Sequence, residues 1–157
     1  MSAADDNGPL ERRSPEGTMS AEVTVPEGFV PYTEPGPFLD RVGPLYERYD
    51  DRGLVFGFCV LAHHCNRRGF AHGGLLVTLA DVTLGKAAER RSDPPVSLLT
   101  TSITYDFIGV ARRGQWIEAQ ADFKRVGREI AFANCYIRSG GRKIGRASGV
   151  FKVAPKA

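Results

Sequence analysis

One predicted helix, residues 74–91, constrains the fold of this chain more than any other feature. The segment is rich in helix formers and contains no proline. At 100° per residue its apolar side chains point in nearly all directions: Leu75, Leu79 and Val82 form one stripe, and Val77, Leu84 and Ala88 lie near the opposite side. A helix that is apolar around most of its circumference is usually enclosed. We therefore expect a buried helix, with the surface that the chain does not cover packed against a second subunit.

Strand candidates lie on both sides of this helix. Residues 45–49 and 53–62 precede it, after a short helical turn at 38–43, and four candidates follow it, broken at 109–114, 126–128 and 139–142. Within 115–124 the side chains alternate, with Ile117, Ala119, Ala121 and Phe123 on the apolar face. Short turns between consecutive strands favour antiparallel pairing. The prediction is an α+β fold in which a curved, mainly antiparallel sheet of five to six strands wraps the helix, the last four strands forming a meander.

The length of 157 residues suits one domain. The first 37 residues contain six of the ten prolines and few large apolar side chains, so we expect residues 1–36 to be a disordered or extended tail and 37–157 to be the folded domain. No apolar stretch is long enough to cross a bilayer, and the N-terminus does not resemble a secretory signal. Three cysteines without CxxC spacing argue against a disulfide framework, so a cytoplasmic location is expected.

Charge is distributed unevenly along the chain. Residues 1–37 carry a net charge of −5, residues 38–108 carry zero, and residues 109–157 carry +8. The last third is therefore where an anionic partner is expected, and both a nucleic acid and a phosphorylated small molecule would satisfy that field.

Asp81 is the one acid in the middle of the apolar helix. Aspartate is seldom buried without a partner, because removing the charged carboxylate from water is costly. One interpretation is that Asp81 faces solvent or bonds to nearby backbone. The other is that it is a carboxylate held in a cleft as a general base or a nucleophile.

The start of the helix is unusual as well. The segment 70–74 (FAHGG) offers no Ser, Thr, Asp or Asn as an N-cap, so we expect the first N–H groups to stay available to an outside acceptor such as a polarised carbonyl oxygen. The alternative is that the glycines form a tight turn and that water accepts hydrogen bonds from those N–H groups. Six residues earlier, Asn66 could orient a water or a substrate carbonyl, although a turn is the commoner role of a loop asparagine.

Taken together, Asn66-x-x-Gly69-x-x-His72-Gly73-Gly74 followed by Asp81 resembles the signature of hotdog-fold acyl-CoA thioesterases of the PaaI type. The resemblance runs from about residue 38 to 153 and includes the segments 37–45, 103–105 and 146–151. It implies hydrolysis of an acyl-CoA to a carboxylate and free coenzyme A in the cytoplasm, by a homo-oligomer that is a dimer or a dimer of dimers (a homotetramer). No cofactor, metal, nucleic acid or membrane is expected to take part.

The resemblance also implies roles for single residues. The Gly73 N–H would polarise the thioester carbonyl, and Asp81 from the partner subunit would activate water or attack the carbonyl. Asn66 would position water or the leaving group, and His72 would hold the loop or touch the thioester. Gly74 and Thr100 are expected substrate contacts. Gly85 stands where relatives often carry Ser or Thr, which removes a hydrogen bond and leaves space for a bulkier acyl group.

The basic last third offers residues for the phosphates of coenzyme A. Lys124, Arg125 and Arg128 flank a turn between two strands, and Arg112 and Arg113 mark the preceding turn. Either cluster could hold the phosphates, since arginine binds phosphate with two parallel hydrogen bonds. The alternative is that these are solvated turn residues.

Other functions were weighed against this interpretation. Zinc binding by His63, His64, Cys65 and His72 matches no tetrahedral ligand spacing, since adjacent histidines would point apart in a strand. A Cys65–His72 nucleophilic pair lacks an orienting third group. A hotdog hydratase or dehydratase would need its own His–Asp or His–Glu motif. A non-catalytic module that binds acyl-CoA would have no need of Asp81.

Overall fold

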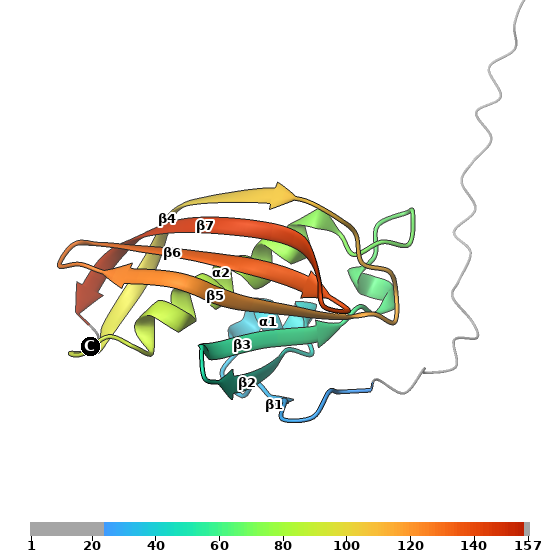
Figure 1. Ribbon diagram of the computed structural model, residues 1–157, viewed down its shortest axis with the longest axis horizontal. Coiled ribbons are helices and arrows are strands. Elements are labelled where there is room, and N and C mark those ends of the chain that lie inside the picture. Colours follow the sequence, from blue (N-terminus) through green and yellow to red (C-terminus); the bar gives the residue numbers. More distant parts are fainter. Residues whose placement is uncertain (1–23, 156–157) are drawn as a thin grey trace, which may run out of the picture.

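The computed structural model describes residues 24–155. It contains two helices and one 3₁₀ turn: α1 (Gly36–Val42), η1 (Ala62–His64) and α2 (Gly73–Glu89). Its strands are β1 (Val30–Pro31), β2 (Tyr46–Asp50), β3 (Gly53–Cys59), β4 (Val96–Phe107), β5 (Trp116–Val126), β6 (Ile130–Ser139) and β7 (Arg142–Pro155). The predicted α+β architecture is confirmed, since α2 lies along one face of a single curved antiparallel sheet (Figure 1).

The order of the strands corrects the predicted meander. The sheet has seven strands in the order β1-β2-β3-β5-β6-β7-β4, the two-residue β1 being additional to the strands expected. Only β5, β6 and β7 form a meander, because β4 pairs with β7 and lies at the far edge (Figure 1). The chain therefore passes from one edge of the sheet to its middle between β4 and β5. Most side chains of β4 are exposed, Leu99 to 69% and Phe107 to 60%.

Small side chains on the inner face of the sheet allow α2 to pack closely. Five buried inner positions of β5, β6 and β7 are alanine: Ala119, Ala121, Ala131, Ala133 and Ala147 are all less than 5% exposed. A Cβ atom on Gly149 would lie 3.2 Å from the Leu84 side chain of α2. Leu76, Leu79 and Leu84 fill the space between helix and sheet. Where α2 crosses the sheet, leucines of the helix therefore pack against small side chains, while Phe56, Ile117 and Phe151 of the strands fill other parts of the core.

A bulge in β5 changes which side chains face the helix. The pairing register of β5 with β6 shifts between Ala121 and Phe123, so an extra residue enters the strand and reverses the alternation beyond it. Val126 packs against the core after this shift, while Arg125 is exposed. The simple alternation predicted over 115–124 is therefore wrong beyond Ala121, and the side chain of Phe123 lies outside the described part of the structure.

Residues 1–23 of the expected tail lie outside the described residues. Of the remainder, β1 pairs with β2, and the side chains of Phe29 and Tyr32 are buried at 8% and 7% exposure. The Tyr32 ring packs edge-on against Phe56 with centroids 5.0 Å apart. Residues 29–32 thus lie against the sheet at the edge opposite β4.

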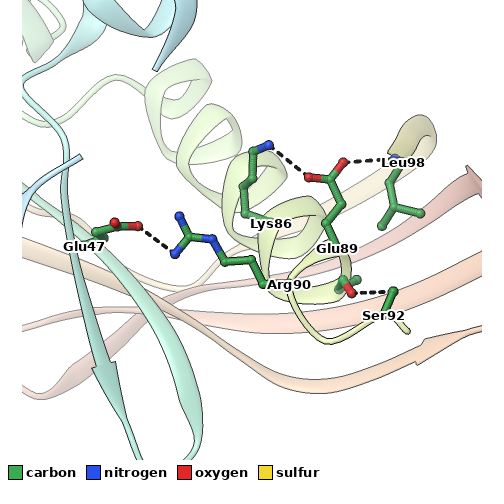
Figure 2. Close-up of polar contacts among 7 residues, drawn as sticks. Glu47, Lys86, Glu89, Arg90, Ser92 and Leu98 are labelled. Carbon is green, nitrogen blue, oxygen red and sulfur yellow. Dashed lines mark hydrogen bonds and ion pairs between the residues drawn. The ribbon is translucent and has the colours of Figure 1, made fainter. Parts of the chain in front are cut away.

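Polar contacts anchor the last turn of α2 (Figure 2). Glu89 accepts hydrogen bonds from the Lys86 ammonium at 2.9 Å and from the Leu98 N–H of β4 at 3.0 Å. Arg90 forms an ion pair with Glu47 of β2 at 3.0 Å. The C-terminal end of α2 is therefore bonded to β2, near one edge of the sheet, and to β4, at the opposite edge. No helix within residues 24–155 is long and apolar enough to cross a membrane.

Candidate active site

Asp81 lies in the middle of α2 and contacts the edge strand. Its side chain is half-buried, and its Oδ1 accepts a hydrogen bond of 2.8 Å from the Thr100 hydroxyl of β4. No lysine, arginine or histidine in residues 24–155 forms an ion pair with this carboxylate. Thr100 sits beside a register shift between Thr100 and Ser102, where the edge strand bends. The carboxylate is therefore oriented by a neutral donor and not by a cationic side chain of the described residues.

The start of α2 has an N-cap that the sequence analysis did not expect. His72 has extended backbone angles, and its Nδ1 accepts a hydrogen bond of 3.0 Å from the Gly74 N–H. The expectation that all the first N–H groups are open is thus wrong for Gly74, because an imidazole nitrogen can accept a hydrogen bond as the usual cap residues do. In a neutral ring this bond leaves the proton on Nε2.

Gly73 provides the open N–H group at this helix start. No acceptor for its N–H is found among the described residues, while the neighbouring Gly74 N–H is bound to His72. A Cβ atom on Gly73 would lie 3.0 Å from the Phe107 ring, so glycine fits the close approach of the end of β4. An unsatisfied N–H at the positive end of a helix dipole is suited to an oxyanion.

Asn66 shapes the loop that leads into α2. Its Oδ1 accepts hydrogen bonds from the N–H groups of Arg68, at 2.9 Å, and of Phe70, at 3.3 Å. The turn closes at Gly69, whose φ of +76° suits glycine. Asn66 thus has the turn role that was the alternative interpretation. Its amide NH₂ has no acceptor within residues 24–155, so it remains able to donate to a ligand.

The buried His64 ring holds the same loop in place through hydrogen bonds to the backbone. Its side chain is 3% exposed; Nδ1 accepts from the Leu61 N–H at 3.0 Å, and Nε2 lies 2.7 Å from the Val42 carbonyl oxygen. Burial lowers the pKa of His64, which favours the neutral ring that donates from Nε2. The rings of His63 and His64 are 4.0 Å apart in a 3₁₀ turn, so they do not point apart as the strand assumption required. No motif or spacing in the sequence indicated this role of His64.

Cys65 and His72 each have other partners. The Cys65 thiol lies 3.4 Å from the Leu61 carbonyl oxygen, and the His72 Nδ1 binds Gly74. Within residues 24–155, no three His, Cys, Asp or Glu side chains are grouped as metal ligands would be.

One protomer does not bring Gly73 and Asp81 to the same point. The two residues are eight positions apart on α2, which is about 12 Å along a helix that rises 1.5 Å per residue. A bond between a carbonyl carbon and its oxygen is only about 1.2 Å long. A single carbonyl group therefore cannot contact both the Gly73 N–H and the Asp81 carboxylate of one chain.

The two predicted phosphate contacts lie in different surroundings. Arg128 lines a cleft at the C-terminal end of α2, whereas Arg125 is exposed and does not line it. Lys124, predicted together with these two arginines, lines the same cleft, and so does Arg91, which was not predicted. The β5 bulge that turns Lys124 toward the helix has no signal in the alternating pattern.

Comparisons with known proteins identify the family of this chain. A family model described as "Thioesterase superfamily" matches residues 68–153, which include His72, Gly73, Asp81 and Thr100. A protein of Pseudomonas aeruginosa named Putative esterase PA0474 is 45% identical over 130 residues, covering 82% of this chain and 97% of that protein.

Solved structures share the fold. A mutant of the phenylacetic acid degradation protein PaaI from Thermus thermophilus is 25% identical, with a TM-score of 0.64, over 74% of this chain and 97% of that chain. A hypothetical thioesterase from Streptococcus pneumoniae, solved with coenzyme A, is 19% identical, with a TM-score of 0.64, over 71% of this chain and 90% of that chain. The second likeness is evidence of the fold alone.

Proposed function

This chain belongs to the thioesterase superfamily and has the hotdog fold of its PaaI-type members, and from that premise we propose that it hydrolyses an acyl-CoA. Thioester hydrolysis in general follows from the family. That the thiol is coenzyme A is our proposal, supported by the basic last third of the chain. A thioesterase of the same fold was also solved with coenzyme A.

In the proposed reaction, water and the thioester give a carboxylate and a free thiol. The C–S bond breaks, a new C–O bond forms, and the thiolate takes up a proton. Asp81 acts either as the general base that removes a proton from the attacking water or as the nucleophile that attacks the carbonyl and is released by water. A thiolate leaves readily, so no strong general acid is needed.

The oxyanion that develops during attack binds the Gly73 N–H. Preorganised N–H donors stabilise such charge because they are already oriented before the reaction begins. His72 keeps the helix start in place through its bond to Gly74, and the Asn66 amide is free to hold water or the carbonyl oxygen. Gly74 contributes a close backbone approach at the same turn.

The observation that carries the proposal is the hydrogen bond from Thr100 to Asp81. A surface aspartate on a helix needs no hydroxyl from the neighbouring strand to orient it. Here the hydroxyl fixes one carboxylate oxygen and leaves the other available for a proton or a carbonyl carbon. Among the described residues no ion pair occupies the carboxylate, so both a water and a substrate carbonyl can approach it.

We propose that two protomers complete each site. Since Gly73 and Asp81 are about 12 Å apart on one helix, the carbonyl must lie between Gly73 of one protomer and Asp81 of another. Strand β4, with a free edge and exposed Leu99 and Phe107, is the surface beside Asp81 where a second copy would pack. In a two-fold dimer the same contact occurs twice and gives two equivalent sites. Two such dimers forming a tetramer would leave this arrangement unchanged.

The first experiment measures thiol release from a panel of aromatic and aliphatic acyl-CoAs. Wild type is compared with Asp81→Asn, which keeps the shape, and with Asp81→Ala. We expect turnover by wild type and a loss of at least about 10²-fold in both variants. Full activity in both variants would exclude Asp81 as the catalytic group. Binding of the panel without turnover by wild type would instead favour the acyl-CoA-binding module.

A mixing experiment tests the composite site. Asp81→Ala and Gly73→Pro are each expected to be nearly inactive alone. A mixed dimer contains one site with the intact Gly73 of the first chain and the intact Asp81 of the second. Mixing equal amounts, with subunit exchange, should restore about a quarter of wild-type activity, because half of the dimers are mixed and each has one intact site. No recovery in a mixture shown to contain mixed dimers would refute the shared site.

A further inference from the structure

An exposed aromatic ring lies beside the open N–H group at the start of α2. The side chain of Phe107, the last residue of β4, is 60% exposed. A Cβ atom on Gly73 would lie 3.0 Å and 3.1 Å from two carbons of this ring, so the end of the edge strand meets the start of the helix (Figure 1). Ile108 and Val110 are exposed to 57% and 58%. The ring thus belongs to an apolar segment of the surface and is not an isolated exposed side chain.

A glycine of the neighbouring strand determines where this ring lies. Phe107 is the register partner of Gly145 in β7. The Tyr105 side chain occupies the space over Gly145, since a Cβ atom added there would clash with the Tyr105 hydroxyl. Tyr105 and Phe107 are two residues apart and so lie on the same face of β4. With the space over Gly145 filled by Tyr105, the Phe107 ring is directed toward α2.

The Phe107 ring is supported on one side and open on the other. Its centroid lies 4.5 Å from that of the Tyr105 ring, with the two planes inclined at 46°, a favourable aromatic contact. The backbone that follows is held as well, because the N–H groups of Ile108 and Gly109 both donate to the Ile144 carbonyl oxygen, at 3.0 Å and 2.9 Å. The position of the ring is therefore defined before any ligand binds.

Tyr105 acts here through its ring and not through its hydroxyl. The hydroxyl oxygen is buried and has no hydrogen-bond partner among the described residues. Burial raises the pKa of Tyr105, so the hydroxyl stays protonated at neutral pH. A buried hydroxyl without a partner costs free energy in the folded state, and its removal leaves no other group unsatisfied. Tyr105→Phe therefore keeps everything that supports Phe107.

We propose that Phe107 is a specificity-determining residue of the thioester site, that its ring contacts the acyl group, and that Tyr105 positions it. The inference rests on the proposed hydrolysis, with the Gly73 N–H as the oxyanion donor. A carbonyl oxygen lies about 2.9 Å from the nitrogen that donates to it, and the carbonyl carbon is about 1.2 Å from that oxygen. The first carbons of the acyl group are thus within reach of a ring that contacts Gly73.

The chemistry of this surface favours the acyl group over the thiol arm. The side chains of Phe107, Ile108 and Val110 contain no hydrogen-bonding groups. The pantetheine arm of coenzyme A carries amides, which lose hydrogen bonds to water against an apolar surface. A straight-chain acyl group has none to lose, and its contact with the ring removes apolar area of both from water. A hexanoyl group should gain from Phe107, whereas an acetyl group is too short to cover the ring.

Kinetics with hexanoyl-CoA and acetyl-CoA test this contact. The measured quantity is the acyl selectivity, kcat/KM for hexanoyl-CoA divided by kcat/KM for acetyl-CoA. Phe107→Ala should lower it about tenfold, as the loss of an apolar contact does in a substrate pocket. Phe132→Ala is the matched control, because Phe132 is also an exposed phenylalanine, at 48%, but lies on β6. It should keep the selectivity of wild type. Unchanged selectivity in Phe107→Ala would overturn the proposal.

Two substitutions of Tyr105 test its positioning role. Tyr105→Phe should keep the acyl selectivity of wild type, and Tyr105→Ala, which removes the support of the Phe107 ring, should lower it toward that of Phe107→Ala. A purely structural loss would reduce activity toward both thioesters alike, and that result would overturn the positioning role. Thermal unfolding checks that each variant is folded, and Tyr105→Leu replaces Tyr105→Ala if it is not.

A second copy of the chain is the other candidate to cover Phe107, since we propose that two protomers pack along β4. If the ring serves only that contact, Phe107→Ala should dissociate the dimer in sedimentation velocity and lower kcat/KM for both thioesters equally. That result would overturn the proposal. We expect wild type and Phe107→Ala to sediment alike at the same concentration.

Binding of ketone analogues, in which a CH₂ group replaces the thioester sulfur, does not depend on turnover. By calorimetry, Phe107→Ala should bind the hexanoyl analogue about tenfold more weakly than wild type and the acetyl analogue equally well. Equal affinity of both proteins for the hexanoyl analogue would overturn the contact. If this binding pattern is found but wild type hydrolyses neither thioester, the proposed hydrolysis fails and the Phe107 contact stands.

Discussion

The Thr100 hydroxyl donates a hydrogen bond of 2.8 Å to the Asp81 carboxylate and so joins the edge strand β4 to the middle of α2. Thr100 and Asp81 are 19 positions apart in sequence, and no cationic side chain of the described chain pairs with Asp81. The bond orients a group that would otherwise rotate freely about its side-chain dihedral angles. Its contribution to catalysis can be measured without removing the carboxylate.

Thr100→Val removes this hydroxyl and keeps the shape of the side chain. Because a hydrogen bond to a charged group is worth about 1.5–3 kcal/mol, we expect kcat to fall about tenfold or more. Thr100→Ser restores the donor and should recover most of the activity. Steady-state kinetics with one acyl-CoA give both values. A Val variant as active as wild type would show that the orientation of Asp81 does not limit the reaction.

Gly73 allows the oxyanion donor to be removed with little change to the helix. It is the first residue of α2, where proline is well tolerated, and the extended backbone of His72 suits a residue before proline. Gly73→Pro deletes the N–H and should lower kcat by about 10²–10³-fold.

Gly73→Ala is the control for this substitution. It adds a Cβ against Phe107, as proline does, but keeps the N–H. Phe107 is 60% exposed and able to move aside, so we expect the alanine variant to retain much more activity than the proline variant. Equal loss in the two variants would mean that the Phe107 contact, and not the missing donor, explains the effect.

His64 should make the fold sensitive to mild acid. Burial lowers the pKa of its ring in the folded protein below the usual 6.5, so the unfolded chain binds more protons in the interval between the two pKa values. The contribution of His64 is therefore complete above pH 6.5 and declines as the pH falls toward the pKa of the folded state. We expect Tm to fall more between pH 7.5 and 5.5 in wild type than in His64→Gln.

His63→Gln is the matched control for this pH dependence, because the His63 ring is exposed and lies beside His64. It should retain most of the slope of wild type, because burial lowers the pKa of His64 more than the neighbouring His63 does. If His64→Gln and wild type lose the same Tm over this interval, another group controls the acid sensitivity.

Glu89 should contribute more to stability than its ion pair suggests. Glu89→Ala leaves the Leu98 N–H without its acceptor and should lower the free energy of unfolding by about 1–2 kcal/mol. Glu89→Gln keeps an acceptor and should cost less. Lys86→Ala removes only a partly exposed ion pair, worth at most about 1 kcal/mol. Urea unfolding of the three variants gives the comparison, and a larger loss for Lys86→Ala would contradict it.

Local patterns were sufficient to predict the elements of the fold. The apolar helix, the strand candidates and the breaks between them match α2 and β2 to β7 within a few residues. The position of β4 was not predictable in this way, because a meander and the observed order use the same strands and differ only in long-range pairing. The β5 bulge was missed for a related reason: its extra residue is fixed by pairing with β6 and not by composition.

In the candidate site, too, local residue groups were predictable and long-range contacts were not. The spacing of Asn66, Gly73 and Asp81 singled out the residues that line the start and middle of α2. The His72 cap was missed because histidine is an uncommon N-cap. Arg91 was not grouped with Lys124 and Arg128 because these residues meet only in the folded chain. Residues close in sequence could be grouped, whereas contacts between distant segments required the structure.

The alanine-rich inner face of β5, β6 and β7 limits where this architecture can change. A larger side chain at Ala133 or Ala147 would lift α2 from the sheet and displace Gly73 and Asp81 together. Adaptation to a new acyl group is therefore confined to the two ends of the helix and to the flank along β4. Side chains in the packed layer between α2 and the sheet are therefore constrained in size, and only residues outside this layer are free to vary.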